Sequence, residues 1–122
     1  LKDTSKLVRN RAISVLGSFK NTRAIPTLGM IVLDDPAEKK RIEAAKALGK
    51  IGSNAAVNYL LSGLGSDGDA SVRISCAEAI GHIGGSRAIE HLKIVAESDP
   101  SKKVIRAATT ALEAISKRII EE

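Results

Sequence analysis

The sequence repeats itself with a period of 32 residues. The segment RIEAAKALGKIG, which begins at Arg41, returns as RISCAEAIGHIG at Arg73. Further copies begin at Arg9 and Ile105, so the period extends over the whole chain of 122 residues. A fixed period of this length is the sequence signature of a solenoid, in which similar units stack on one another. We therefore expect one domain over residues 1–122, with units of about 3–34, 35–66, 67–98 and 99–122.

The apolar residues of each unit have the spacing of helices. In the third unit they recur every three or four positions, at Val72, Cys76, Ala79, Ile80 and Ile83. This spacing lines one face of a first helix, and a second apolar pattern with the same period follows it in each complete unit. A pair of helices cannot bury its apolar face alone, so the units must stack. The pattern predicts an all-α solenoid of about four two-helix units.

Helix ends are predicted from Asp, Pro and Gly. Asp35 and Asp99 each precede a proline, and we interpret them as N-caps of first helices with Pro at the first helical position. The second glycine of a unit is predicted to end the first helix in the left-handed region, and the first glycine to let a neighbouring backbone approach. The predicted N-caps of the second helices are Thr22, Asn54 and Ser86. The last unit lacks both glycines, so we expect residues 102 to about 120 to form one long helix.

An aspartate and an arginine recur six residues apart. We hypothesise that the Arg side chains bind Asp or loop carbonyls between units and fix the angle of stacking. This role is structural. The ladder consists of Asp35, Asp67, Asp99, Arg9, Arg41 and Arg73.

These residues resemble a known repeat. The first unit carries Arg9, Ala12, Leu16 and Gly17, then Arg23-Ala24-Ile25-Pro26-x-Leu28 and Asp34-Asp35-Pro36. This pattern is similar to the HEAT-like repeat named after phycobilisome bilin lyases. The resemblance implies a right-handed α-α superhelix whose second helices line the concave surface and whose first helices line the convex one. Such repeats occur in bilin lyase subunits, scaffolds and many prokaryotic proteins, so the resemblance implies no single function.

The concave face implied by the resemblance gives a candidate partner-binding surface. Its residues are Thr27, Met30, Asn58, Tyr59, Ser62, His91 and Ile94. No charged residue occurs between Ile51 and Ser66, and the exposed face of this neutral helix is expected to include Gly63 as well. We expect a partner segment to lie there, between Arg23 and Arg87. Crowding of a short neutral helix is an equally open explanation for the missing charges.

The sequence predicts neither an enzyme nor a metal or cofactor site. His82 precedes Ile83 and His91 precedes Leu92, so neither belongs to the His-Glu dipeptides that bind iron in one HEAT-like enzyme family. No Ser, His and acid set or glycine-rich phosphate loop is present. Cys76 lies in a column of small residues and is expected in the core, where a free cysteine behaves as a small hydrophobe.

Composition bears on location and assembly. No apolar run is long enough to span a bilayer, so we expect a cytoplasmic protein without membrane contact. The chain begins at Leu1, and we expect it to be a fragment of a longer one. Leu112, Ile115 and Ile119 form an apolar stripe. We expect the stripe to pack on the third unit of a monomer, with weak self-association through the last helix as the alternative.

These features favour a non-catalytic scaffold that binds a protein or peptide on its concave face. The first alternative is nucleic-acid binding, and the second is an accessory subunit of a bilin lyase-type enzyme. Against nucleic acid, the third unit is net negative, and Phe19 and Tyr59 are the only aromatic residues available for base stacking. Lys46 and Lys50 are also expected to project from a first helix, and so from the convex face.

Overall fold

The computed structural model describes residues 22–121. This part of the chain contains no strand and six α-helices, which confirms the all-α prediction. Short 3₁₀ helices, η1 (Thr22–Ala24), η2 (Asn54–Ala56) and η3 (Ser86–Ala88), lead into α2, α4 and α6. The α-helices are α2 (Ile25–Asp34), α3 (Glu38–Ile51), α4 (Val57–Ser66), α5 (Ala70–Ile83), α6 (Ile89–Ser98) and α7 (Lys102–Glu121).

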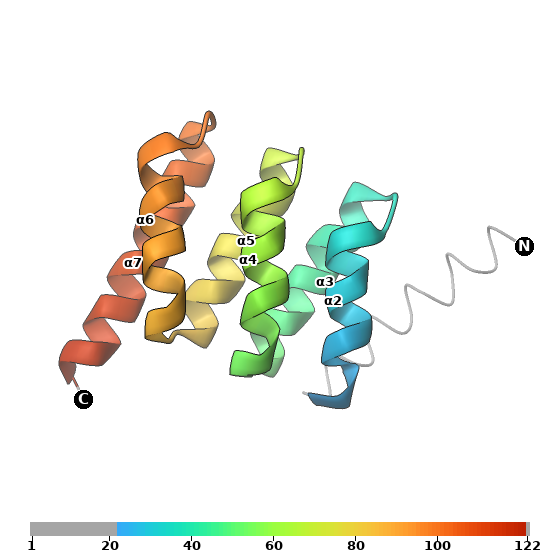
Figure 1. The fold of residues 1–122 in the computed structure, drawn as a ribbon, viewed down its shortest axis with the longest axis horizontal. Coiled ribbons are helices and arrows are strands. Elements are labelled where there is room, and N and C mark those ends of the chain that lie inside the picture. The colour runs from blue at the N-terminus through green and yellow to red at the C-terminus, as the bar shows by residue number, and fades with distance from the viewer. Residues whose placement is uncertain (1–21, 122) are drawn as a thin grey trace, which may run out of the picture.

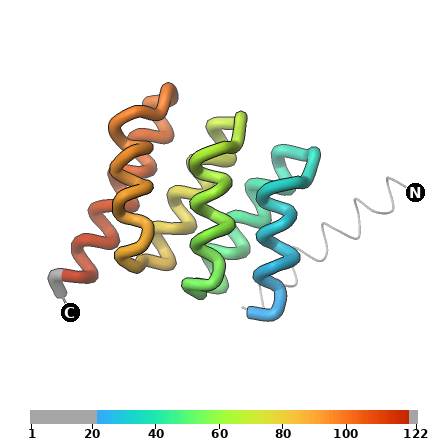
Figure 2. Tube along the Cα trace, viewed as in Figure 1, coloured from blue at the N-terminus to red at the C-terminus, as the bar shows by residue number. Residues whose placement is uncertain are grey.

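The helices stack in two layers (Figures 1 and 2). α2, α4 and α6 lie side by side in one layer, and α3, α5 and α7 lie in the other. We call these the second-helix layer and the first-helix layer, after the place of the helices in the repeat. α2 packs mainly on α3, α4 on α5 and α6 on α7. Each second helix is therefore covered by the first helix of the next unit, as expected for units that share one core.

The predicted apolar columns form a continuous core. Ala44, Cys76 and Ala108 are fully buried, and one buried cluster extends from Ala24 to Ile115. The prediction that Cys76 belongs to the core is confirmed. Burial raises the pKa of its thiol to about 12, with a smaller contribution from the charge of Asp67. The thiol is therefore protonated and enclosed, which makes it unreactive.

Small residues bring the helices of the first-helix layer into close contact. A Cβ added to Gly49 would lie 3.1 Å from both Cα and Cβ of Ala79. In the next unit, a Cβ on Gly81 would lie 3.2 Å from Cα and Cβ of Ala111. The prediction that the first glycine of a unit admits a neighbouring backbone is thus confirmed at Gly49 and Gly81, and Gly17 lies outside the described residues.

The prediction that the aspartates are N-caps was wrong. α3 begins at Glu38 with Ala37 in the N-cap position, and α5 begins at Ala70 after Asp69. Asp35 Oδ1 accepts a hydrogen bond from the N–H of Ala37, two residues on, at 2.8 Å. Asp67 and Asp99 make the same bond at 2.9 Å. The aspartates therefore close Asx turns ahead of the helices, a role that uses the same side-chain oxygen at a different spacing.

The starts of the second helices also differ from expectation. Thr22, Asn54 and Ser86 are the first residues of the 3₁₀ turns rather than N-caps. In the second unit the cap is Ser53, whose Oγ accepts from the N–H of Ala55 at 3.2 Å. The other end of the first helix agrees with prediction at Gly52, which has φ 72° and ψ 17°, the left-handed region that favours glycine. Gly84 ends α5 with a positive φ of 83°, but its ψ of −156° lies outside that region, so the prediction was wrong there.

The last described helix is continuous, as predicted from its missing glycines. α7 extends from Lys102 to Glu121, and Ser101 Oγ accepts from the N–H of Val104 near its start at 3.4 Å. Its apolar stripe is divided between inside and outside. Ile115 is buried in the core, Leu112 is half-buried, and Ile119 is 49% exposed.

Candidate binding surfaces

Arginines of the first helices connect each unit to the next. The Arg73 guanidinium donates from Nε to Asp99 Oδ2 at 2.9 Å and from Nη2 to Asp99 Oδ1 at 3.1 Å. Its Nη1 donates to the main-chain oxygen of Asp67 at 2.9 Å. One unit earlier, Arg41 donates to both Asp67 Oδ2, at 2.9 Å, and the main-chain oxygen of Asp35, at 2.8 Å. The expected inter-unit contacts are present at these two positions, and Arg9 lies outside the described residues.

These pairs are charged and largely enclosed. Burial alone would raise the pKa of Asp99, but hydrogen bonds from Arg73 and the N–H of Ser101, together with the charge of Arg73, lower it below its ordinary value. Burial would likewise lower the pKa of Arg41, but its contacts with Asp67 and Asp69 raise it. Both groups are therefore ionised at neutral pH. A bidentate guanidinium-carboxylate pair also fixes the relative orientation of the two side chains, which suits a contact that connects neighbouring units.

The seven residues expected to bind a partner lie in the second-helix layer. Met30 is 52% exposed and Ile94 is 61% exposed. The side chain of Tyr59 is half-buried, and the others are exposed: Thr27, Asn58, Ser62 and His91. Six of the seven are therefore accessible to a partner, and Tyr59 is accessible in part.

Tyr59 faces the preceding unit. A Cβ added to Gly29 of α2 would overlap the Tyr59 ring, so the missing side chain at Gly29 makes room for the ring between α2 and α4. Because α4 lies between α2 and α6, the ring is held on the side away from His91. This packing accounts for the half-burial of Tyr59 and leaves part of its side chain accessible.

The uncharged helix α4 is less exposed than expected. Gly63 is buried, and a Cβ there would lie 2.7 Å from Cys76 Sγ and 3.1 Å from a methyl group of Val32. The expectation that Gly63 belongs to the exposed face was therefore wrong. At the edge of this helix, Arg87 Nη1 donates to Asn58 Oδ1 at 3.1 Å, which connects α4 to the next unit.

Two grooves open between helices of the first-helix layer. The groove between α3 and α5 has a volume of about 590 Å³, and Lys46, Lys50 and Ser75 are among its lining residues. The groove between α5 and α7 has a volume of about 570 Å³. The resemblance had assigned this layer to the convex side, away from any partner. Lys46 and Lys50 lie on α3, in the first-helix layer as expected, and they line this groove.

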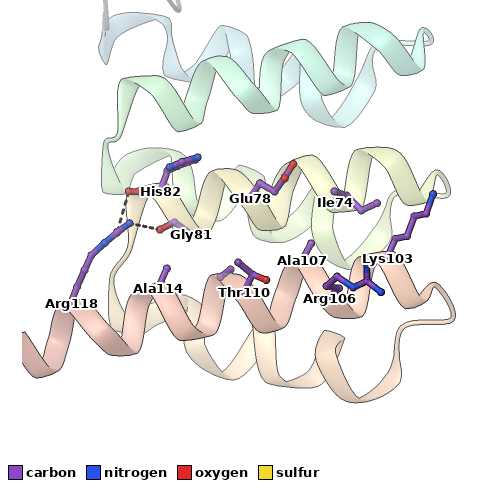
Figure 3. A pocket seen from close by; sticks show the side chains of 11 residues that line it. Ile74, Glu78, Gly81, His82, Lys103, Arg106, Ala107, Thr110, Ala114 and Arg118 are labelled. Carbon is purple, nitrogen blue, oxygen red and sulfur yellow. Dashed lines mark hydrogen bonds between the residues drawn. The ribbon is translucent and has the colours of Figure 1, made fainter.

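Figure 3 shows the α5–α7 groove from close by. Small side chains from α7, Ala107, Ala111 and Ala114, line it opposite Gly81 and Ile74 of α5. At one end, Arg118 reaches across and donates to the main-chain oxygens of Gly81 at 2.7 Å and His82 at 3.1 Å. The positive charge thereby satisfies carbonyls at the C-terminal end of α5, where a helix favours cations.

The opposite end of this groove carries positive charge that no side chain within residues 22–121 pairs with. Lys103 and Arg106 line it near the start of α7. Neither forms an ion pair or a side-chain hydrogen bond with another residue in the described part of the chain. Glu78 is the one acidic residue among those lining the groove.

Residues 22–121 contain neither a metal-binding cluster nor a membrane-spanning helix. No group of three His, Cys, Asp or Glu residues able to hold a metal ion was found in this range. None of the helices described there is long and apolar enough to cross a membrane.

Comparison with known families identifies the repeat. A family model of HEAT repeats matches residues 1–75 and 30–113. This chain belongs to the HEAT-repeat family. HEAT repeats generally act as scaffolds for protein interactions and are generally non-catalytic. No characterised protein matches the chain closely enough to count as a relative.

Proposed function

We propose that this HEAT-repeat stack is a non-catalytic scaffold that binds a segment of a partner protein on its second-helix layer. The binding surface consists of Thr27, Met30, Asn58, Tyr59, Ser62, His91 and Ile94. The ladder of Arg41, Arg73 and their aspartates holds the units at a fixed angle and so keeps this surface in one shape.

The exposure of large apolar side chains carries the proposal. Among the described residues, Met30, Leu33, Ile94 and Ile119 are the large hydrophobic side chains that remain exposed. Three of the four lie on the second-helix layer, and none lies on α3 or α5. Met30 and Leu33 lie on α2 and Ile94 lies on α6, with α4 between them. Exposed apolar side chains of this kind offer anchor points for a partner protein, and methionine adapts easily to different partners.

The proposal is tested with peptides selected from a random library on the immobilised domain. Binding of each selected peptide is measured by fluorescence anisotropy against the wild type, Met30→Ser and Ile94→Ser. Ile119→Ser is the matched control, because Ile119 is about as exposed as Met30 but lies on α7. We expect binding to weaken about tenfold in the first two variants and to stay unchanged in the control. Equal affinities in all four proteins, or no saturable binding, would contradict the proposal.

Nucleic acid is the second candidate, and the position of Lys46 and Lys50 in the α3–α5 groove favours it. Against it, Tyr59 is the one Phe, Tyr or Trp residue in the described part of the chain. Its ring packs on Gly29 in the second-helix layer, whereas the groove lies in the first-helix layer. Phosphate contacts give affinity that falls steeply with salt, so titration with a generic duplex at two salt concentrations separates the two candidates. A titration with a bilin, followed by its absorbance, tests the finer resemblance to the repeats of bilin lyases.

A further inference from the structure

We propose that the groove between α5 and α7 binds an acidic amphipathic helix of a protein partner. This inference rests on the proposed protein-binding function and adds to it a second surface and the chemical class of its ligand. The shape of the groove, its lining and its unpaired charges support it.

The groove has the length and lining to hold a helix. Its lining extends along α7 from Lys103 to Arg118, a distance of about 22 Å at a rise of about 1.5 Å per residue. This corresponds to about four helical turns. Ala107, Ala111 and Ala114 leave a shallow trough along one wall, because their side chains end at Cβ. Apolar side chains on one face of a partner helix, three or four residues apart, would enter this trough.

The charges of the groove decide which helix fits. Lys103 and Arg106 lie at one end and form no ion pair with a described residue, whereas Arg118 at the other end already binds main-chain carbonyls. A partner with glutamate or aspartate at the end that meets Lys103 and Arg106 would pair with both. Complementary charges of this kind set orientation and speed association.

The same lining favours a peptide over nucleic acid. Small and apolar side chains make up most of it, and it contains no Phe, Tyr or Trp on which a base could stack; its one aromatic ring is the imidazole of His82. Glu78 lies on α5 between the basic end and Arg118, where a continuous phosphate backbone would pass a negative charge. An apolar trough with two cations at one end that bind no described residue, and with Arg118 engaged at the other, matches a helix that is apolar along one face and acidic at one end.

The test uses a fluorescein-labelled amphipathic peptide of about 15 residues, long enough to span the groove, with leucines on one face and glutamates at one end. A peptide with lysine in place of each glutamate and a DNA duplex of about 20 base pairs are measured beside it. We expect saturable binding of the acidic peptide and at least about tenfold weaker binding of the basic one. Equal binding of both peptides would overturn the proposal.

Charge-reversal variants locate the site. Lys103→Glu with Arg106→Glu is compared with Lys39→Glu with Lys117→Glu, which changes the net charge equally. Lys39 occupies the same repeat position as Lys103 on α3, Lys117 lies on α7, and neither lines the groove. We expect the first pair to weaken peptide binding about tenfold or more and the second pair to weaken it less than about threefold. Similar losses in both pairs would show non-specific attraction and would overturn the proposal.

A steric variant distinguishes the outcomes further. Ala114→Leu fills the trough without adding charge, and we expect it to abolish peptide binding while circular dichroism shows an unchanged helix content. If the peptide is instead lost in Met30→Ser, the groove inference fails and the proposed function stands. If no peptide binds to any surface, the proposed function fails as well. Duplex binding that is lost in Lys103→Glu with Arg106→Glu would assign the groove to nucleic acid and overturn the peptide proposal.

Discussion

Replacing Arg73 by methionine tests whether the ladder stabilises the stack. The substitution keeps most of the aliphatic stem but removes both bonds to the Asp99 carboxylate and the bond to the main-chain oxygen of Asp67. The side chains of Arg73 and Asp99 are only 12% and 7% exposed, so water replaces these bonds poorly. Breaking a buried pair by removing one partner costs about 3–5 kcal/mol, and we expect about 3 kcal/mol here.

Thermal unfolding followed by circular dichroism measures the loss. For a chain of 122 residues the unfolding entropy is about 0.26 kcal/mol per kelvin, so 3 kcal/mol lowers Tm by about 12 °C. The Tm of Arg73→Lys should lie between those of the wild type and Arg73→Met, because an ammonium keeps the charge but does not bind a carboxylate bidentately. Arg87→Met is the matched control: Arg87 is exposed and makes one hydrogen bond to Asn58, so its loss should cost less than about 1 kcal/mol.

The pH dependence gives a second readout of the same contact. The pKa of Asp99 is lowered in the folded state, so its contribution to stability is present above the unfolded value of about 3.9. That contribution is lost as the pH falls through the lowered folded pKa. The Tm difference between the wild type and Arg73→Met should therefore shrink from about pH 6 to about pH 2. A difference below about 2 °C at neutral pH, or one that is constant down to about pH 2, would show that the ladder does not stabilise the stack through this ion pair.

Three further predictions concern packing. Gly49→Ala should lower the free energy of unfolding by about 1–2 kcal/mol, because its new Cβ meets Ala79. Gly65→Ala should raise it by up to about 1 kcal/mol, because a Cβ on this residue of α4 meets no other atom and alanine favours a helix. Equal urea midpoints of the two variants would contradict this. Cys76 should react with a thiol reagent only as fast as the domain unfolds, and rapid labelling of the native protein would show that its enclosure is wrong. Ile119→Glu should change the free energy of unfolding by less than about 0.5 kcal/mol, because Ile119 is exposed. Sedimentation of the wild type and this variant tests self-association: a dimer that forms through Ile119 should be absent in the variant.

The repeat pattern carried most of the information about the fold. Each buried column recurs at one register position, so the repeat alone assigned Ala44, Cys76 and Ala108 to the core. Missing glycines similarly predicted the continuous helix α7. These features depend on local spacing and on the need of each unit to cover its neighbour, both of which are written directly in the sequence.

Other features depend on geometry that residue type leaves open. An aspartate ahead of a helix can cap it or close an Asx turn, because both roles use the same carboxylate oxygen. Only the structure shows that Asp35 accepts a hydrogen bond from Ala37 and that the helix begins at Glu38. The grooves depend on how the helices of neighbouring units lie against each other. A signal was nevertheless present, because Gly81 predicted close packing of first helices, and Lys103 and Arg106 lie on the helix that packs against it.

Chemical-shift mapping tests whether the second-helix layer of the stack is a protein-binding surface. A selected peptide is titrated into the isotopically labelled domain, and the shifts of the backbone amides are followed to saturation. We expect saturable shifts around Met30 and Ile94, while amides of the ladder, such as that of Arg73, stay in place. Shifts that spread evenly over the domain, or saturable shifts with a DNA duplex and none with any peptide, would contradict a protein-binding role.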